Sequence, residues 1–288
     1  MPLLHIGGYE WLDWHLHPEV VVPLLLLQGL YLYVVTELRP LVSDAARVKR
    51  SQMALFSLAV LVMYLATGWP LHALAEDYLA SAHMLQHLLL TMVAAPLLLA
   101  GTPVWVWQAL LRPRLALAAG RLITHPGVAL VGFNLVLLLT HLPGSVQLQL
   151  EQPWFHLLVH ISLVAAGLLL WWPVLSAVPE LPALSYPLQM GYLFLQSLLP
   201  AVMASFVTFS DGVVYHVYEN APRVWGISPV EDQRMAGGLM KLLGSLILWT
   251  FIALAFFRWY EREEAEARGL PWRDVEAELD RLGLRPKK

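Results

Sequence analysis

The feature that most constrains this chain is a series of apolar stretches, each about as long as a bilayer is thick. Seven of them cover residues 19–38, 51–69, 79–100, 122–142, 154–174, 186–210 and 235–259. Each has roughly the 20 residues that a helix needs to cross the hydrocarbon core. In that medium a single segment satisfies its own backbone polar groups only as a helix. The sequence therefore predicts an all-α membrane protein with seven transmembrane helices.

Composition supports this class and limits the available chemistry. Hydrophobic residues make up 58% of the chain and charged residues 14%, whereas a soluble domain has about 25% charged residues. Cysteine is absent, which excludes disulfides, thiolate metal sites and cysteine nucleophiles. Histidine, methionine and the carboxylates remain as metal ligands. The even spread of apolar stretches predicts one transmembrane domain over residues 1–260. A charged tail, residues 261–288, follows it, with a short amphipathic helix near residues 271–282.

The distribution of Lys and Arg predicts the orientation of the helices. The connections after the first and third stretches, together with the tail from Arg258 onward, hold 15 of the 18 basic residues. The opposite side holds only Arg223 and Arg234, and Lys241 lies within the last stretch. Basic loops stay on the cytoplasmic side. We therefore expect the amino terminus outside and the carboxyl terminus in the cytoplasm. Lys241 is expected to snorkel outward or to pair with Asp211 or Asp232.

Two histidine pairs stand out within the apolar stretches. His83 and His87 are four residues apart, and so are His156 and His160. On a helix this spacing places both imidazoles of a pair on one face. His87 and His160 are expected about 6 Å deeper than His83 and His156. The predicted orientation puts both pairs on the outer side, where His141 ends the fourth stretch.

Several interpretations of these histidines are open. A single histidine near a helix end is usually an interfacial residue, but ionisable groups inside membrane segments are costly and indicate function. Imidazole is a common ligand of copper, zinc and haem iron. Methionines such as Met84 and Met240 supply soft thioethers, although core packing is the better explanation of each of them taken singly. Catalytic motifs are absent from the sequence: it has no Gly-x-Ser-x-Gly, no His-Glu-x-x-His and no phosphate-binding loop. We therefore expect a protein that is not an enzyme and binds no nucleic acid.

Four segments carry a resemblance to a known family. They are residues 82–107 (AHMLQHLLLTMVAAPLLLAGTPVWVW), 140–143 (THLP), 171–174 (WWPV) and 228–241 (SPVEDQRMAGGLMK). The chain resembles the CtaG family of bacterial cytochrome c oxidase assembly proteins, which have seven helices. The resemblance implies a multi-pass protein of the bacterial cytoplasmic membrane that helps a haem–copper oxidase to mature by holding or delivering copper. Its partners would be oxidase subunits and an extracytoplasmic copper carrier.

The resemblance and the spacing together predict a copper site on the outer side. The expected ligands of copper, as Cu(I), are His83, His87, His141, His156, His160 and Met240. Asp232 and Gln233 are expected behind them, with Asp232 orienting a ligand imidazole. One alternative is a b-type haem held by His87 and His160 as axial ligands. Another is a copper transporter, which predicts ligands spread through the depth of the membrane.

Overall fold

The computed structural model of the protein describes residues 18–38, 48–268 and 272–282, and these residues form helices and no strand. Six helical segments are long and apolar enough to cross a membrane. They are α1 with the π-helix η2 (Pro18–Leu38), α3 with α4 (Arg50–Asp77), α5 with the π-helix η3 and α6 (Ala80–Gly101), α11 (Pro153–Leu175), α12 (Tyr186–Thr208), and α13 with the π-helix η5 and α14 (Pro229–Glu266). The prediction of an all-helical membrane protein is confirmed. The orientation stays a prediction.

The predicted fourth stretch, residues 122–142, is bent rather than straight. Helix α8 (Arg114–Ile123) and helix α9 (Pro126–Thr140) meet at 72° and form a seventh span if the two are counted as one. Helix α9 has 15 residues, or about 22 Å, which is less than the roughly 30 Å hydrocarbon core. Pro126 explains the break, because proline disfavours helical geometry in the residue before it. His125 accordingly has an extended backbone.

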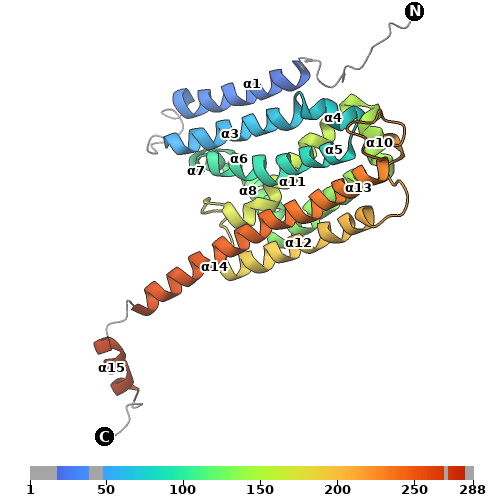
Figure 1. Ribbon diagram of the computed structural model, residues 1–288. Coiled ribbons are helices and arrows are strands. Elements are labelled where there is room, and N and C mark those ends of the chain that lie inside the picture. Colours follow the sequence, from blue (N-terminus) through green and yellow to red (C-terminus); the bar gives the residue numbers. More distant parts are fainter. Residues whose placement is uncertain (1–17, 39–47, 269–271, 283–288) are drawn as a thin grey trace, which may run out of the picture.

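The span Ala80–Gly101 is the centre of the bundle. In its most apolar part 72% of the residues are buried, against 56% or less in the other spans. It consists of α5 (Ala80–Leu88), η3 (Leu89–Ala94) and α6 (Ala95–Gly101). Figure 1 shows α1 and α3 stacked on one side of it, with α12 and the α13–α14 helix on the other. Side chains from α5 therefore point into the core.

A π-helical segment begins directly after the His83–His87 turn. Such widened turns leave backbone groups that need other partners. The Thr91 hydroxyl donates to the carbonyl oxygen of His87 at 2.7 Å, and Trp171 Nε1 of α11 donates to the carbonyl oxygen of Thr91 at 2.9 Å. Helix α11 also packs closely at this point, because a Cβ on Gly167 would lie 3.1 Å from Thr91 Cα. The central span and α11 are thus joined about one turn beyond His87 and about two to three turns beyond His160.

The remaining elements are shorter helices and the individual parts of the composite spans. They are α3 proper (Arg50–Thr67), α4 (Leu71–Asp77), α7 (Val104–Leu111), α10 (Pro143–Glu151), the 3-10 turn η4 (His216–Tyr218), α13 (Pro229–Gly238), η5 (Leu239–Leu243), α14 (Gly244–Arg268) and α15 (Trp272–Arg281). Helix α15 agrees with the short helix expected near residues 271–282. Helix α14 runs through residue 260, so the expected domain boundary lies inside a continuous helix.

Candidate metal centre

Three different helices bring the five predicted histidines into one buried cluster. α5 contributes His83 and His87, the end of α9 contributes His141, and α11 contributes His156 and His160. None is more than 9% exposed. The rings of His83 and His156 lie 5.7 Å apart, and those of His87 and His160 lie 5.8 Å apart. The cluster therefore has the two levels that the four-residue spacing indicates. His5, His15 and His17 lie outside the described residues.

The imidazole nitrogens approach one another in pairs. His87 Nδ1 lies 3.3 Å from His141 Nε2, and His156 Nε2 lies 3.0 Å from His160 Nε2. Two nitrogens that bind one ion at about 2.0–2.1 Å with a tetrahedral angle are about 3.3 Å apart. Both pairs are therefore close to the separation of ligands on a shared ion. In the part of the chain that the structure describes, no group of three or more His, Asp or Glu side chains is arranged so that it could hold one metal ion as it stands.

Three nitrogens in the cluster are buried and make no hydrogen bond of normal geometry with the described residues, although the Gln149 side chain lies near His83. They are both ring nitrogens of His83 and Nε2 of His87. A buried polar atom without a partner costs about 1–3 kcal/mol. Such atoms call for an explanation. An ion bound by neutral imidazoles would take one nitrogen of each ring, which would account for Nε2 of His87 and for one of the two nitrogens of His83. The donor chemistry of the cluster thus fits a metal that binds neutral imidazole.

A cavity of about 190 Å³ lies beside the cluster. His83 and His141 line one side of it, and Met84, Met203 and Met240 contribute to its walls. Met240 is 5% exposed and also lines a smaller cavity of about 30 Å³ next to His87. The remaining lining is mostly apolar. The predicted ligand Met240 is therefore placed beside the histidines, together with two further thioethers.

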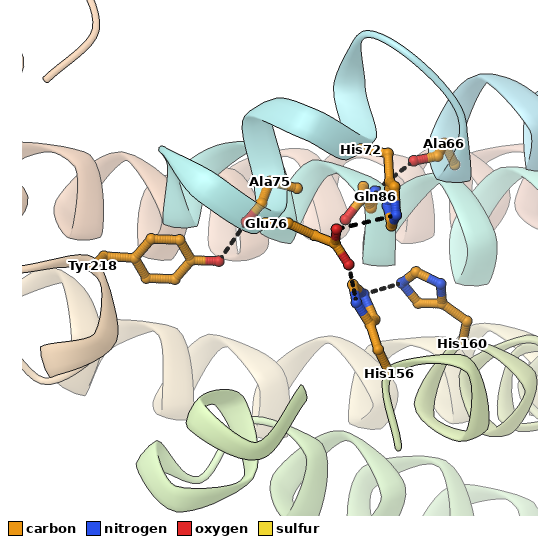
Figure 2. A network of polar contacts seen from close by, with 8 residues as sticks. All are labelled: Ala66, His72, Ala75, Glu76, Gln86, His156, His160 and Tyr218. Carbon is orange, nitrogen blue, oxygen red and sulfur yellow. Dashed lines mark hydrogen bonds and ion pairs between the residues drawn. The ribbon is translucent and has the colours of Figure 1, made fainter. Parts of the chain in front are cut away.

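The structure adds two residues that sequence reasoning missed, His72 and Glu76 of α4. The Glu76 carboxylate lies between two imidazoles, with Oε1 2.7 Å from His156 Nδ1 and Oε2 3.3 Å from His72 Nε2 (Figure 2). Helix α4 lies in the connection between the second and third predicted spans, where both residues look like ordinary loop residues. Their spacing of four residues was the available signal, since it places both on one helical face.

Asp232 and Gln233 make contacts other than the expected ones. The Asp232 carboxylate accepts hydrogen bonds from the backbone amides of Ala80 and Ser81 at 2.6 and 3.0 Å, and from the Ser81 hydroxyl. Gln233 accepts from the Val214 amide at 2.5 Å and donates to the carbonyl oxygen of Gly212 at 3.1 Å. Asp232 therefore holds the start of α5 rather than an imidazole, and Gln233 holds the connection that follows α12.

Lys241 makes contacts other than the expected ion pair, and its outward snorkelling stays a prediction. Its ammonium group donates to the Ser205 hydroxyl at 3.1 Å and lies 5.5 Å from the centre of the Phe209 ring. Both partners are on or next to α12. In the described part of the chain these contacts take the place of the expected pairing with Asp211 or Asp232. Lys241 thus joins η5 to α12 and lies apart from the histidines.

Two tyrosines in the connection between α12 and α13 bond to residues of the cluster and of α4. Burial raises the pKa of Tyr218 well above its usual value, with the nearby Asp232 and Glu76 carboxylates adding to the effect, and burial raises the pKa of Tyr215 to about 12. Both phenols are therefore neutral donors at physiological pH. Tyr218 donates to the carbonyl oxygen of Ala75 at 2.6 Å, and Tyr215 donates to that of His141 at 3.1 Å.

Comparisons with known proteins identify the family. No curated protein and no solved structure matches the chain at a significant level. Residues 29–262 match the family model described as cytochrome c oxidase caa3 assembly factor (Caa3_CtaG), and this range includes every histidine of the cluster, Met240 and α4. The resemblance noted in the sequence is confirmed. The chain belongs to the cytochrome c oxidase caa3 assembly factor family and is a multi-pass membrane protein associated with the assembly of that oxidase.

Proposed function

We propose that the protein holds Cu(I) in the histidine cluster and passes it to a haem–copper oxidase during assembly. The observation that carries the proposal is the set of buried nitrogens on His83 and His87 that make no hydrogen bond of normal geometry with the described residues. They lie beside a cavity whose walls include three thioethers. Membership of the family connects the protein to the oxidase. The imidazole and thioether side chains at the cluster favour copper as the metal.

Ligand chemistry favours Cu(I) over other metals. Thioether ligands select soft copper, and imidazole suits copper as well. A monovalent ion surrounded by neutral ligands needs no anionic cage, which fits a cluster whose predicted ligands are all uncharged. The paired geometry also suits cargo, because Cu(I) accepts few ligands and is released more easily from an open site than from a closed one. The protein's part is to hold the ion and to exclude water.

The available space argues against the haem alternative. Pockets for small molecules and cofactors usually have about 300–1,000 Å³, whereas the cavities beside the cluster have about 190 and 30 Å³. The rings of His87 and His160 are also in edge contact, 5.8 Å between centroids, with no gap for a macrocycle. The location of the ligands in one cluster likewise favours handling of copper on one side over transport through the membrane. We place that side outside the cytoplasm and the protein in the bacterial cytoplasmic membrane, with an extracytoplasmic carrier as copper donor.

The test is metal analysis of protein purified in mild detergent without chelator. We expect a colourless protein that holds close to stoichiometric copper after loading with Cu(I). The double variant His83→Ala/His156→Ala is expected to lose retained copper while keeping its helical circular dichroism spectrum. His216→Ala is the matched control, because His216 is exposed and pairs with Glu219 away from the cluster. A copper content of the double variant equal to that of the wild type would contradict the proposed site. A Soret band with a matching amount of iron would show instead that the protein binds haem.

A further inference from the structure

We infer that Glu76 is a positioning residue for His156, which it holds in the one tautomer that presents Nε2 to the metal. The inference rests on the proposed function and adds α4 to the copper site. Figure 2 shows the Glu76 side chain reaching from α4 to the imidazole of His156 on α11. The side chain of Glu76 is 34% exposed and that of His156 is 4% exposed. The carboxylate thus stands at the outer mouth of the cluster and faces inward.

The direction of the proton at His156 follows from its partner. A carboxylate only accepts hydrogen bonds, so the 2.7 Å contact requires that His156 Nδ1 carries the hydrogen. A neutral imidazole has one ring N–H, and Nε2 therefore keeps its lone pair. Nε2 is the nitrogen that lies 3.0 Å from His160 Nε2. With Glu76 in place, His156 presents an acceptor to the interior of the cluster.

A second chain of hydrogen bonds holds Glu76 itself. Gln86 Nε2 donates to the carbonyl oxygen of Ala66 at 2.7 Å and lies 3.3 Å from His72 Nδ1. Since an amide N–H donates, His72 Nδ1 accepts and the hydrogen of His72 is on Nε2. That nitrogen is 3.3 Å from Glu76 Oε2, where the hydrogen is needed. The donors and acceptors are therefore mutually consistent: Gln86 donates to His72, and His72 and His156 both donate to the Glu76 carboxylate.

The same arrangement occurs where carboxylates support metal-binding histidines in other proteins. Such a carboxylate fixes the tautomer, orients the ring and makes the ligand nitrogen more basic, and its loss weakens metal affinity about 10–100-fold. In this protein Tyr218 supports the position of Glu76 by donating a hydrogen bond to the carbonyl oxygen of Ala75, the residue before Glu76 on α4. Helix α4 is thus a structural part of the copper site rather than a plain connection.

The first experiment measures the tautomer in the protein prepared without metal. Nitrogen-15 NMR of histidine-labelled protein in lipid bilayers separates Nδ1–H from Nε2–H imidazoles. The signal that disappears in His156→Ala is assigned to His156, and it is expected to report Nδ1–H in the wild type. Glu76→Ala is expected to change that signal. Glu219→Gln is the control, because it alters an exposed His–Glu pair that touches no residue of the cluster.

The second experiment measures Cu(I) affinity by competition with a chromophoric Cu(I) chelator. Glu76→Ala is expected to weaken binding about 10–100-fold, and Glu76→Gln, which keeps an acceptor oxygen for His156, to weaken it less. A double-mutant cycle supplies the decisive comparison, because coupled residues are not additive. In the His156→Ala background, Glu76→Ala is expected to have no further effect, since Glu76 acts through His156.

The outcomes separate this inference from the proposed function. Binding of copper with an unchanged His156 signal in Glu76→Ala, or an equal loss of affinity in both backgrounds of the cycle, would overturn the positioning role alone. A wild-type protein that binds no Cu(I) would overturn the proposed function and, with it, the link to copper. In that case the NMR result still decides whether Glu76 sets the tautomer of His156.

Discussion

At the scale of single residues, Asp232 joins α13 to the start of the helix that carries His83 and His87. Its side chain is 3% exposed, and both carboxylate oxygens accept hydrogen bonds at the start of α5. The first amides of a helix lack partners within the helix, and the positive end of the helix dipole favours an anion. Asp232 therefore caps a helix that is more than 140 residues away in sequence. By holding this first turn in place, Asp232 positions His83 along the axis of α5 relative to the other histidines.

The replacement Asp232→Ala tests this role. It leaves the Ala80 and Ser81 amides without their acceptor, and hydrogen bonds to a charged group contribute about 1.5–3 kcal/mol. We expect a loss of stability of that size in detergent unfolding, with faster hydrogen exchange over residues 80–87. Glu231→Ala is the neighbouring control, since Glu231 is exposed and its hydrogen bonds within the described residues go to Ser228, directly before its own helix. Equal exchange over α5 in both variants would contradict the capping role.

At the scale of elements, the approach of α13 to α12 depends on one of two adjacent glycines. A Cβ on Gly237 would lie 2.9 Å from the carbonyl oxygen of Ala204 and 3.0 Å from the Thr208 amide, whereas a Cβ on Gly238 meets nothing within 4 Å. Small residues such as glycine allow helices inside a membrane to approach closely. The structure assigns that role to Gly237. Helix α13 also carries Asp232 and Gln233, so this contact positions both.

The two glycines form a matched pair for mutation. Gly237→Ala forces α13 away from α12, and overpacking of this kind costs about 1–3 kcal/mol. Gly238→Ala is expected to leave stability unchanged or to raise it by up to about 1 kcal/mol, because alanine is the better helix former. Thermal unfolding in detergent measures both changes. Equal effects of the two variants would show that the close contact at Gly237 does not limit stability.

At the scale of the whole molecule, the predicted orientation awaits a direct test. The chain has no cysteine, so a single introduced cysteine gives one thiol. Glu219 and Glu180 are both exposed and lie on opposite predicted sides. We expect Glu219→Cys to react with a membrane-impermeant maleimide in intact cells, and Glu180→Cys to react only after the membrane is opened. The reverse labelling pattern would show that the predicted orientation is wrong and that the histidine cluster lies on the cytoplasmic side.

Local sequence alone determined the helical spans and the pairing of histidines on each helix. Burial in lipid requires helices of about 20 residues, and a spacing of four residues puts His83 with His87 and His156 with His160. Both properties belong to a single helix and do not depend on its neighbours. For this reason the positions of the spans and the two levels of the cluster were predictable, apart from the bend at Pro126.

Tertiary structure alone decided which side chains meet between helices. The pairing of His87 with His141, the bond of Glu76 to His156 and the cap that Asp232 gives to α5 each join residues at least 54 positions apart. They depend on which helices are neighbours and how closely they approach, as at Gly167 and Gly237. Inside a membrane, apolar faces prefer lipid and protein almost equally, so hydrophobicity does not select the neighbour. Close packing and polar contacts do, and these become visible only when the bundle is assembled.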